Sequence, residues 1–269
     1  MKKVTIDGNG ICSEIAYLFT EVSGIYPITP SSPMAENVDK MSSNGKKNFF
    51  NDTVKVVEMQ SEAGAVGMMH GALVSGTLAT TFTASQGLLL MIPNMYKMVG
   101  EMLPGVFHVA SRSLSTHALS IMGDHQDVYA VRSTGVAMLV SSSVQDIAFL
   151  TPVAHLSSIH ASIPMLHFFD GFRTSHELNK IDVLEPSEYQ ELLSKEDVAK
   201  FRSKAMNPLK PNVRGTNQND DVYFQITEAR NKDYDALVDT VVYYMNAINE
   251  KANTDYKPFN YYGSKNAKK

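Results

Sequence analysis

The sequence predicts an α/β fold: a doubly wound, mostly parallel sheet covered by helices on both faces. Short apolar runs rich in β-branched residues alternate along the chain with longer segments whose apolar residues recur at helical spacing. No tight turn such as Asn-Gly joins two of the apolar runs directly, as it would in a series of hairpins. Parallel strands need a crossover connection, which the helical segments supply, so we expect most strands to lie parallel.

The chain begins with a helix and a proline-rich loop. Apolar residues recur every three or four positions over 12–22, which predicts a helix there. Three prolines break segment 24–33, and because proline cannot sit inside a central strand we expect this segment to be a rigid, extended loop. Ser31 or Ser32 then caps a second helix, which runs to about residue 42.

Strand and helix units follow. The strands are predicted at 53–59, 78–83 and 106–110 and the intervening helices at about 62–75 and 88–102. We expect strand 53–59 to be buried, because it is rich in β-branched residues. Helix 88–102 carries a proline in its middle, which should kink it.

The second half of the chain repeats the alternation and then changes character. A polar loop at 123–127 opens a short helix, and the elements predicted after it are a strand at 136–140, a helix at 144–160 and a strand at 164–169. Segment 207–216 is a polar connector, and an amphipathic helix follows at 233–252. We therefore expect one α/β domain over 1–256, with 257–269 as the start of a linker to a next domain outside this chain.

Composition limits the classes of function. The chain has 269 residues, of which 43% are hydrophobic, enough for the core of one large domain. Its formal charge of -4 argues against a nucleic-acid or anionic membrane surface, so we expect small molecules or proteins as partners. No apolar run is long enough to span a bilayer and no signal-peptide core follows Met1. We expect a cytoplasmic protein, with an organelle such as the hydrogenosome as the alternative compartment.

Cys12 is the single cysteine of the chain. It excludes an internal disulfide, and it excludes an iron–sulfur cluster ligated by cysteines of this chain alone. Metal-ligand residue types do occur near the end of strand 164–169. They are His167, Asp170, His176 and Glu177. Their spacing matches no compact zinc pattern and phenylalanines interleave them, so we predict no metal site.

Polar residues after three strands form the stronger candidate site. Thr29, Glu62 and Arg112 each follow an apolar segment, at what would be the carboxyl edge of one parallel sheet. Open α/β sheets bind ligands at this edge. A hydroxyl, a partly buried carboxylate and a guanidinium could together hold a polar heterocycle and a small carboxylate substrate, because arginine offers a bidentate fork to a carboxylate.

Two other classes of function compete with that reading. Segment 83–87, Thr-Ala-Ser-Gln-Gly, is similar to the strand-to-helix nucleophile elbow of serine hydrolases, with Ser85 at the turn. The first glycine of that motif is missing, however, and a serine that caps the following helix is the simpler interpretation. A non-catalytic binding module is the other alternative.

Four segments resemble the pyruvate:ferredoxin (flavodoxin) oxidoreductases. They are IYPITPSS at 25–32, EMQSEAG at 58–64, TFTASQGLLLMIPNMYK at 81–97 and HFFDGFRTSHE at 167–177. The matches are long, ungapped and spread over most of the chain. The resemblance implies that this chain is the N-terminal domain of that large enzyme, the one that contacts the pyrimidine ring of thiamine diphosphate.

The resemblance also implies roles and partners. Glu62 would hydrogen-bond the aminopyrimidine ring as the cofactor-binding catalytic residue, and Thr29 and Arg112 would hold pyruvate. Coenzyme A would accept the acetyl group, and ferredoxin or flavodoxin the electrons, in an enzyme expected to be a homodimer. Mg2+ and the [4Fe-4S] clusters would belong to absent domains, since the chain has no Gly-Asp-Gly motif and one cysteine. The fragment alone should be inactive.

Overall fold

A six-stranded parallel sheet forms the centre of the computed structural model, which describes residues 1–267. The strands run in the spatial order β3-β2-β4-β5-β7-β6, and every neighbouring pair is parallel. Their bounds are β2 Val22–Ile25, β3 Lys55–Glu58, β4 Ala79–Thr83, β5 Val106–Ser111, β6 Ala137–Ser141 and β7 Met165–Asp170. The predicted doubly wound, mostly parallel α/β fold is thereby confirmed.

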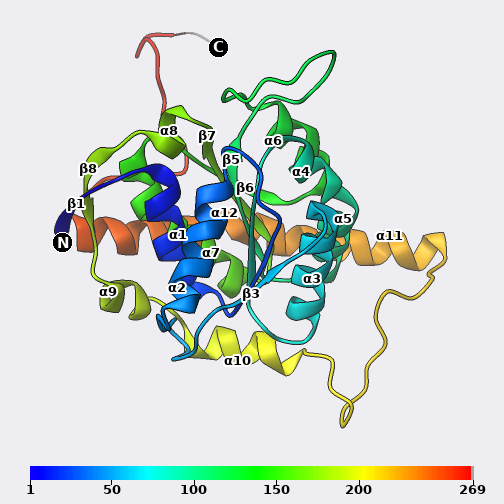
Figure 1. Cartoon of the computed structure of the whole chain (residues 1–269). Coiled ribbons are helices and arrows are strands. Elements are labelled where there is room, and N and C mark those ends of the chain that lie inside the picture. Colours follow the sequence, from blue (N-terminus) through cyan, green and yellow to red (C-terminus); the bar gives the residue numbers. More distant parts are fainter. Residues whose placement is uncertain (268–269) are drawn as a thin grey trace.

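Helices cover both faces of the sheet (Figure 1). One face carries α1 Gly8–Phe19, α2 Ser32–Ser43 and α7 Val144–Ala161, which pack against one another. The other face carries α3 Glu62–Val74, α4 Ser85–Leu90, α5 Ile92–Glu101 and α6 Gln126–Val131. The 3-10 turn η1, Arg132–Thr134, follows α6 directly. The buried core consists mainly of side chains between these layers and the sheet.

Three local predictions need correction. The helix predicted over 12–22 starts earlier, at Gly8, and ends at Phe19, and the central strand β2 begins where the sequence predicts only the end of that helix and a loop. Strand β3 lies at the edge of the sheet with Lys55 and Glu58 exposed, so it is not the buried strand that its β-branched residues suggested. Helix 88–102 is broken rather than kinked: α4 and α5 are separate helices, and Pro93 lies in the first turn of α5.

The sequence analysis did not predict the antiparallel pair or helices α8 to α11, whereas the amphipathic helix predicted over 233–252 corresponds to α12, Asn231–Ala252. Strand β1, Lys2–Ile6, pairs antiparallel with β8, Asn179–Val183, and forms a separate two-stranded sheet. The short helix α8, Arg173–His176, lies between β7 and β8. The later helices are α9 Pro186–Gln190, α10 Lys195–Ser203, α11 Asp220–Ala229 and α12 Asn231–Ala252.

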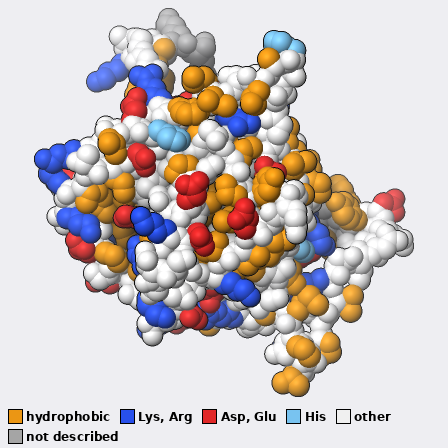
Figure 2. All heavy atoms as spheres, viewed as in Figure 1, with side chains coloured by type: hydrophobic (Ala, Val, Ile, Leu, Met, Phe, Trp, Pro, Cys, Tyr) orange, Lys and Arg blue, Asp and Glu red, His pale blue; other side chains and the backbone are white. Residues whose placement is uncertain are grey.

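Helix α12 packs on α7 and forms a further layer behind the sheet, as its predicted amphipathic pattern requires. Helix α11 has no buried residue and projects from the molecule at the end of the connector that leaves α10 (Figure 1). Figure 2 shows hydrophobic side chains gathered over this connector, and also over the loop that projects between β5 and α6. Apolar side chains exposed in that loop are Leu119, Ile121 and Met122.

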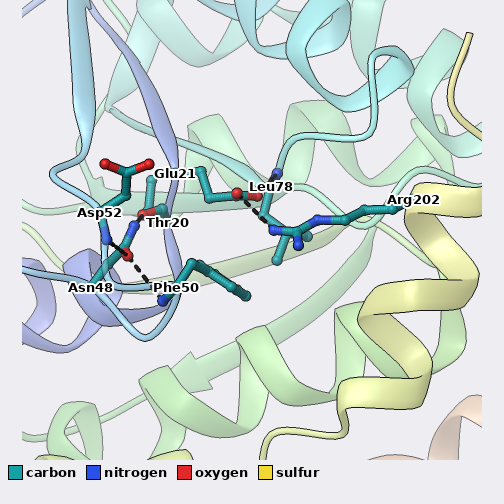
Figure 3. Close-up of polar contacts among 7 residues, drawn as sticks. All are labelled: Thr20, Glu21, Asn48, Phe50, Asp52, Leu78 and Arg202. Carbon is teal, nitrogen blue, oxygen red and sulfur yellow. Dashed lines mark hydrogen bonds and ion pairs between the residues drawn. The ribbon is translucent and has the colours of Figure 1, made fainter. Parts of the chain in front are cut away.

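Polar contacts hold the amino edge of the sheet, opposite the candidate site (Figure 3). The Asn48 side chain donates to the Thr20 carbonyl at 2.7 Å and accepts from the backbone N–H groups of Phe50 and Asp52, both at 3.0 Å. One buried amide thus ties the end of α1 to the loop that enters β3.

Glu21 and Arg202 fasten α10 to the same edge (Figure 3). Glu21 accepts from the backbone N–H of Leu78 at 2.9 Å and pairs with Arg202 at 2.7 Å. A contact between residues so far apart in sequence fixes α10 beneath the strands.

No helix among residues 1–267 is long and apolar enough to cross a membrane. Residues 1–252 hold all the helices and strands of the described chain. Of the predicted linker over 257–269, positions 268 and 269 lie outside the described residues.

Candidate active site at the carboxyl edge of the sheet

Glu62 begins helix α3, directly after the turn that leaves β3. Ser61 caps this helix, because its hydroxyl accepts a hydrogen bond from the backbone N–H of Gly64 at 3.2 Å. The helix start holds the Glu62 side chain at the carboxyl edge, where it is only 6% exposed. No hydrogen bond joins its carboxylate to another residue within the described part of the chain. A buried carboxylate without such a partner is open to a ligand that donates one.

Gly87 faces Glu62 from the first turn of α4. A Cβ atom at this position would lie 2.6 Å from Glu62 Oε1 and 2.7 Å from Thr83 Oγ1, closer than side-chain atoms can approach. The Thr83 hydroxyl is buried and has no hydrogen-bond partner among residues 1–267. Glycine is therefore required for this helix start to approach the carboxylate, and two polar side chains converge on the same small space.

Arg112 follows β5 and reaches across the strand ends to the loop after β2. Its Nη1 atom donates to the Thr29 carbonyl at 2.6 Å, whereas its buried Nε atom has no partner among the described residues. Burial lowers the pKa of the Arg112 guanidinium, and the carboxylates of Asp127 and Glu62 raise it. The structure thus brings together Thr29, Glu62 and Arg112, but through the Thr29 carbonyl rather than its exposed side chain.

Asp127, in the first turn of α6, is a site residue that the sequence analysis missed. It is fully buried and accepts hydrogen bonds from residues at the ends of β4 and β5. Burial raises the pKa of its carboxyl, and the hydrogen bonds it accepts lower it. The sequence places Asp127 in a polar loop that opens a short helix, and such residues are usually solvated. Only the strand order reveals that this carboxylate lies under the neighbouring strand ends.

Ser85 occupies the strand-to-helix turn between β4 and α4, with a left-handed φ of 52°. Its hydroxyl lies 2.5 Å from Gln86 Oε1 and 2.7 Å from the Ser113 carbonyl, and no histidine ring contacts it among the described residues. A serine nucleophile needs a base within hydrogen-bond reach. The hydrolase alternative is therefore not supported. Nor does Ser85 cap α4 with its side chain, because Ala84 is the N-cap residue.

Three buried histidines form a chain that joins β6, β7, β5 and α7. Ser141 Oγ lies 2.8 Å from His167 Nε2, the Nδ1 atoms of His167 and His108 are 3.1 Å apart, and His108 Nε2 lies 3.0 Å from His155 Nε2. Burial lowers the pKa of His155 and His167 to about 3, and lowers that of His108 as well. The three rings are therefore neutral at pH 7 and hydrogen-bonded to each other.

The residues of metal-ligand type near the end of β7 do not gather around one point. They are His167, Asp170, His176 and Glu177. His167 points into the histidine chain, whereas His176 bonds Ser175 and stacks on Phe172. Within the described residues, the potential metal ligands that gather closely are Cys12, His108 and His167. The Nδ1 atoms of these two rings already bond each other, and burial raises the pKa of the Cys12 thiol. We assign no metal to this cluster.

Comparison with known proteins places these residues in a family. Residues 14–246 match the family model described as "Pyruvate flavodoxin/ferredoxin oxidoreductase, thiamine diP-bdg". The chain is 57% identical over 266 residues to the pyruvate-flavodoxin oxidoreductase of Enterobacter agglomerans, covering 99% of this chain and 23% of the relative. It is 54% identical over 269 residues to the pyruvate:ferredoxin oxidoreductase of Moorella thermoacetica, covering 100% of this chain and 23% of that protein. The chain thus spans less than a quarter of these relatives.

A solved structure with the same fold is the 2-oxoglutarate:ferredoxin oxidoreductase from Magnetococcus marinus, which has 2-oxoglutarate, coenzyme A and succinyl-CoA bound. The TM-score is 0.71 and the sequence identity 16%, and the match covers 88% of this chain and 45% of that one. At this identity the match supports the fold alone.

Proposed function

Because this chain belongs to the pyruvate flavodoxin/ferredoxin oxidoreductase family of thiamine diphosphate-binding domains, we propose that it forms half of the active site of a larger pyruvate-oxidising enzyme. The reaction we propose is the oxidative decarboxylation of pyruvate to acetyl-CoA and carbon dioxide, with electrons passed to ferredoxin or flavodoxin. The observation that carries the proposal is Glu62, which is buried at the carboxyl edge and whose carboxylate makes no hydrogen bond to another of the described residues.

The residues present fit the pyrimidine ring of thiamine diphosphate. Gly87 leaves open the space beside Glu62 that any larger side chain would fill, and the Thr83 hydroxyl facing it is buried, with no hydrogen-bond partner in the described part of the chain. An aminopyrimidine offers ring nitrogens and an exocyclic amine, which can satisfy a carboxylate and a hydroxyl in a small polar pocket. We place the diphosphate and Mg2+ in another part of the longer protein, because this sequence has no Gly-Asp-Gly motif.

We assign Glu62 to proton exchange with the ring. Its carboxylate would accept a hydrogen bond from a ring nitrogen of bound thiamine diphosphate and would hold or release the proton there. When bound, thiamine diphosphate supplies the carbon nucleophile that adds to the keto group and holds the charge left by carbon dioxide. The task of this chain is to orient and polarise the cofactor, and to keep a carboxylate fixed where the proton moves.

We assign Arg112 and Thr29 to pyruvate. With Nη1 committed to the Thr29 carbonyl, Nε and Nη2 are left on the other edge of the guanidinium, and together they form a side-on fork for a carboxylate. The exposed Thr29 hydroxyl adds a neutral donor from the loop that Arg112 holds in place. A carboxylate substrate would satisfy the unpartnered Nε–H.

The remaining steps belong to the longer protein. We place the [4Fe-4S] clusters, the docking of ferredoxin or flavodoxin and the transfer of the acetyl group to coenzyme A in parts outside this chain, which has one cysteine. The assembly we propose is a homodimer in the cytoplasm or in an organelle. One relative, from Euglena gracilis, is called mitochondrial.

Glu62→Gln in the full-length enzyme tests the proposal. The amide keeps the shape of the side chain but cannot exchange a proton with the ring. We expect the variant to fold and retain some cofactor, while deuterium exchange at the thiazolium carbon, read by NMR after acid quench, slows by about 10²–10⁴-fold.

Glu58→Gln is the matched control, because Glu58 carries the same charge four residues earlier but is exposed at the end of β3. Exchange in this variant should equal that of the parent. If Glu62→Gln stays within a few-fold of the parent, Glu62 is not the activating carboxylate. If Glu58→Gln then slows exchange, that role belongs to Glu58.

A further inference from the structure

We infer that Asp127 is a positioning residue, which holds Arg112 in register with the neighbouring strand so that its guanidinium faces the substrate. The inference rests on the proposed function, because it assigns a role in pyruvate binding. Asp127 follows the loop that projects beyond β5, in the first turn of the short helix α6, and its side chain is fully buried.

The Asp127 carboxylate joins two strand ends through one oxygen. Oδ2 accepts from the backbone N–H of Ser85, which follows β4, at 2.8 Å, and from the backbone N–H of Arg112, which follows β5, at 3.0 Å. Neither amide continues the pairing between these strands, which ends at Thr83 and Val109. Asp127 therefore supplies the bond between β4 and β5 at the point where the sheet no longer does.

The other oxygen anchors the carboxylate itself. Oδ1 lies 2.5 Å from Ser111 Oγ and accepts from the backbone N–H of Val128 at 2.7 Å. A buried carboxylate is costly unless hydrogen bonds compensate it, and here four groups surround the two oxygens. Both oxygens are occupied by the protein, so Asp127 has no free acceptor for substrate. Its effect must pass through the groups that it holds.

These hydrogen bonds fix the position of the Arg112 backbone, from which its long side chain extends. Arginine has many rotamers, and its backbone must be held if its far end is to meet a small ligand. Asp127 fixes the Arg112 backbone at one end, and the Thr29 carbonyl holds the guanidinium at the other. The negative charge of Asp127 also favours the charged form of the guanidinium.

Asp127→Asn in the full-length enzyme is the first test. An amide has one acceptor oxygen. It therefore cannot accept from the backbone N–H groups of Ser85 and Arg112 and also, with a second oxygen, from the backbone N–H of Val128. Amide hydrogen exchange, followed by mass spectrometry of peptides containing residues 85 and 112, should become faster by at least about tenfold, whereas exchange elsewhere in β4 and β5 stays slow.

Asp124→Asn is the control. Asp124 lies in the same loop and loses the same charge, but among the described residues its side chain accepts only from the backbone N–H of Gln126, and it is exposed. We expect Asp127→Asn to lower kcat/KM for pyruvate by about 10- to 100-fold, the size that a misplaced binding group causes, with cofactor affinity within threefold of the parent. Asp124→Asn should match the parent in each measurement.

A double-mutant cycle separates positioning from general destabilisation. In an Arg112→Ala background, Asp127→Asn should lower kcat/KM by less than threefold, because the guanidinium that it positions is gone. An equal loss in both backgrounds, an equal loss in Asp124→Asn, or unchanged amide exchange at 85 and 112 overturns the inference.

Ser111→Ala keeps the inference testable if Asp127→Asn does not fold. It removes one of the four groups around the carboxylate and leaves Arg112 intact, so it should raise KM for pyruvate several-fold in the parent and have no effect in the Arg112→Ala background. A loss in both backgrounds contradicts positioning. If the parent enzyme shows no pyruvate-dependent reduction of its acceptor, the proposed function fails, while the amide-exchange result still decides whether Asp127 holds the strand ends.

Discussion

Gly87 shows how strongly a single residue limits this site. A methyl group there would lie 2.6 Å from Glu62 Oε1, so Gly87→Ala must displace the carboxylate or the start of α4. We expect the full-length variant to fold but to lose about 10²-fold in the rate of thiazolium exchange, as expected for a catalytic group moved by about 1 Å.

Gly71→Ala is the control for Gly87. Gly71 lies inside α3, and a Cβ atom there meets nothing within 4 Å. Since alanine favours a helix over glycine by about 0.5–1 kcal/mol, this variant should be as active as the parent and slightly more stable in thermal unfolding. Equal activity of the two alanine variants would show that the space beside Glu62 is not needed for cofactor binding.

Arg112→Ala and Thr29→Val divide the proposed substrate contacts. Arg112→Ala should cost about 2–5 kcal/mol in kcat/KM for pyruvate, because it leaves the substrate carboxylate without its charged partner. Thr29→Val keeps the backbone carbonyl that Arg112 contacts and removes only the hydroxyl, with an expected cost of about 1–2 kcal/mol.

Cofactor affinity distinguishes the two interpretations of Arg112. If Arg112 binds substrate, calorimetry with thiamine diphosphate and Mg2+ should give the same dissociation constant for Arg112→Ala as for the parent. A parallel loss of cofactor and pyruvate binding would instead make Arg112 a structural brace for the Thr29 loop.

At the scale of elements, the side-chain amide of Asn48 holds the loop that enters β3 at the amino edge of the sheet. Asn48→Ala leaves the Thr20 carbonyl and the N–H groups of Phe50 and Asp52 without their partner, and Asn48 is itself only 6% exposed. We expect a destabilisation of about 2–3 kcal/mol, seen as a lower midpoint in thermal unfolding of the protein. Asp52→Ala should change the midpoint little, since the Asp52 backbone makes this contact and its side chain is exposed.

The histidine chain, which joins strands β5, β6 and β7 to helix α7, should make the free energy of unfolding depend on pH. His155 and His167 have pKa values lowered to about 3 in the folded protein, against about 6.5 in an unfolded chain. The unfolded state therefore binds more protons between pH 6.5 and 3, so the stability present above pH 6.5 is lost as the pH falls, by up to about 1.4 kcal/mol per pH unit for each ring.

His155→Gln tests this pH dependence. Glutamine can still bond His108 but does not titrate, so the midpoint of thermal unfolding should fall less steeply between pH 7 and 5 than in the parent. His117→Gln removes an exposed histidine of the projecting loop and serves as the control. An unchanged slope in His155→Gln would mean that the chain takes up its protons without unfolding.

Local sequence patterns predicted the parallel sheet and most of its helices, because each β-branched run and each amphipathic segment carries its own periodicity. They did not predict strands β1 and β8, since each is short and pairs with a segment distant in sequence. They also misjudged β3, because β-branched residues mark a strand without revealing whether it lies at the edge or in the centre. Whether a strand is buried depends on which strands and helices lie next to it, and the local sequence pattern does not contain that information.

The same limit applied to the site. Residues after strands could be identified one by one, and Glu62, Thr29 and Arg112 do lie at one edge. That Arg112 reaches a carbonyl, that Gly87 adjoins Glu62, and that Asp127 joins two strand ends all follow from the spatial order β3-β2-β4-β5. Strand order is a property of the assembled sheet, and no single segment encodes it.

At the scale of the whole molecule, the chain should not act alone. It spans 23% of the relatives from Enterobacter and Moorella, and we place the diphosphate site outside it. We expect no turnover of pyruvate, and no binding tighter than about 10 μM when the isolated chain is titrated calorimetrically with thiamine diphosphate and Mg2+. The full-length enzyme is the positive control. Low-micromolar or tighter binding by the isolated chain would contradict the proposal of a divided site.

The bond from Arg112 to the Thr29 carbonyl joins residues 83 positions apart, and it has a consequence for protein synthesis. At ribosomal rates of about 5–20 residues per second, roughly 4–17 s separate the appearance of the two residues. During that interval the loop after β2 exists without the guanidinium that holds it. A nascent chain can therefore complete the proposed pair of pyruvate contacts only after Arg112 has been made and β5 has joined the sheet.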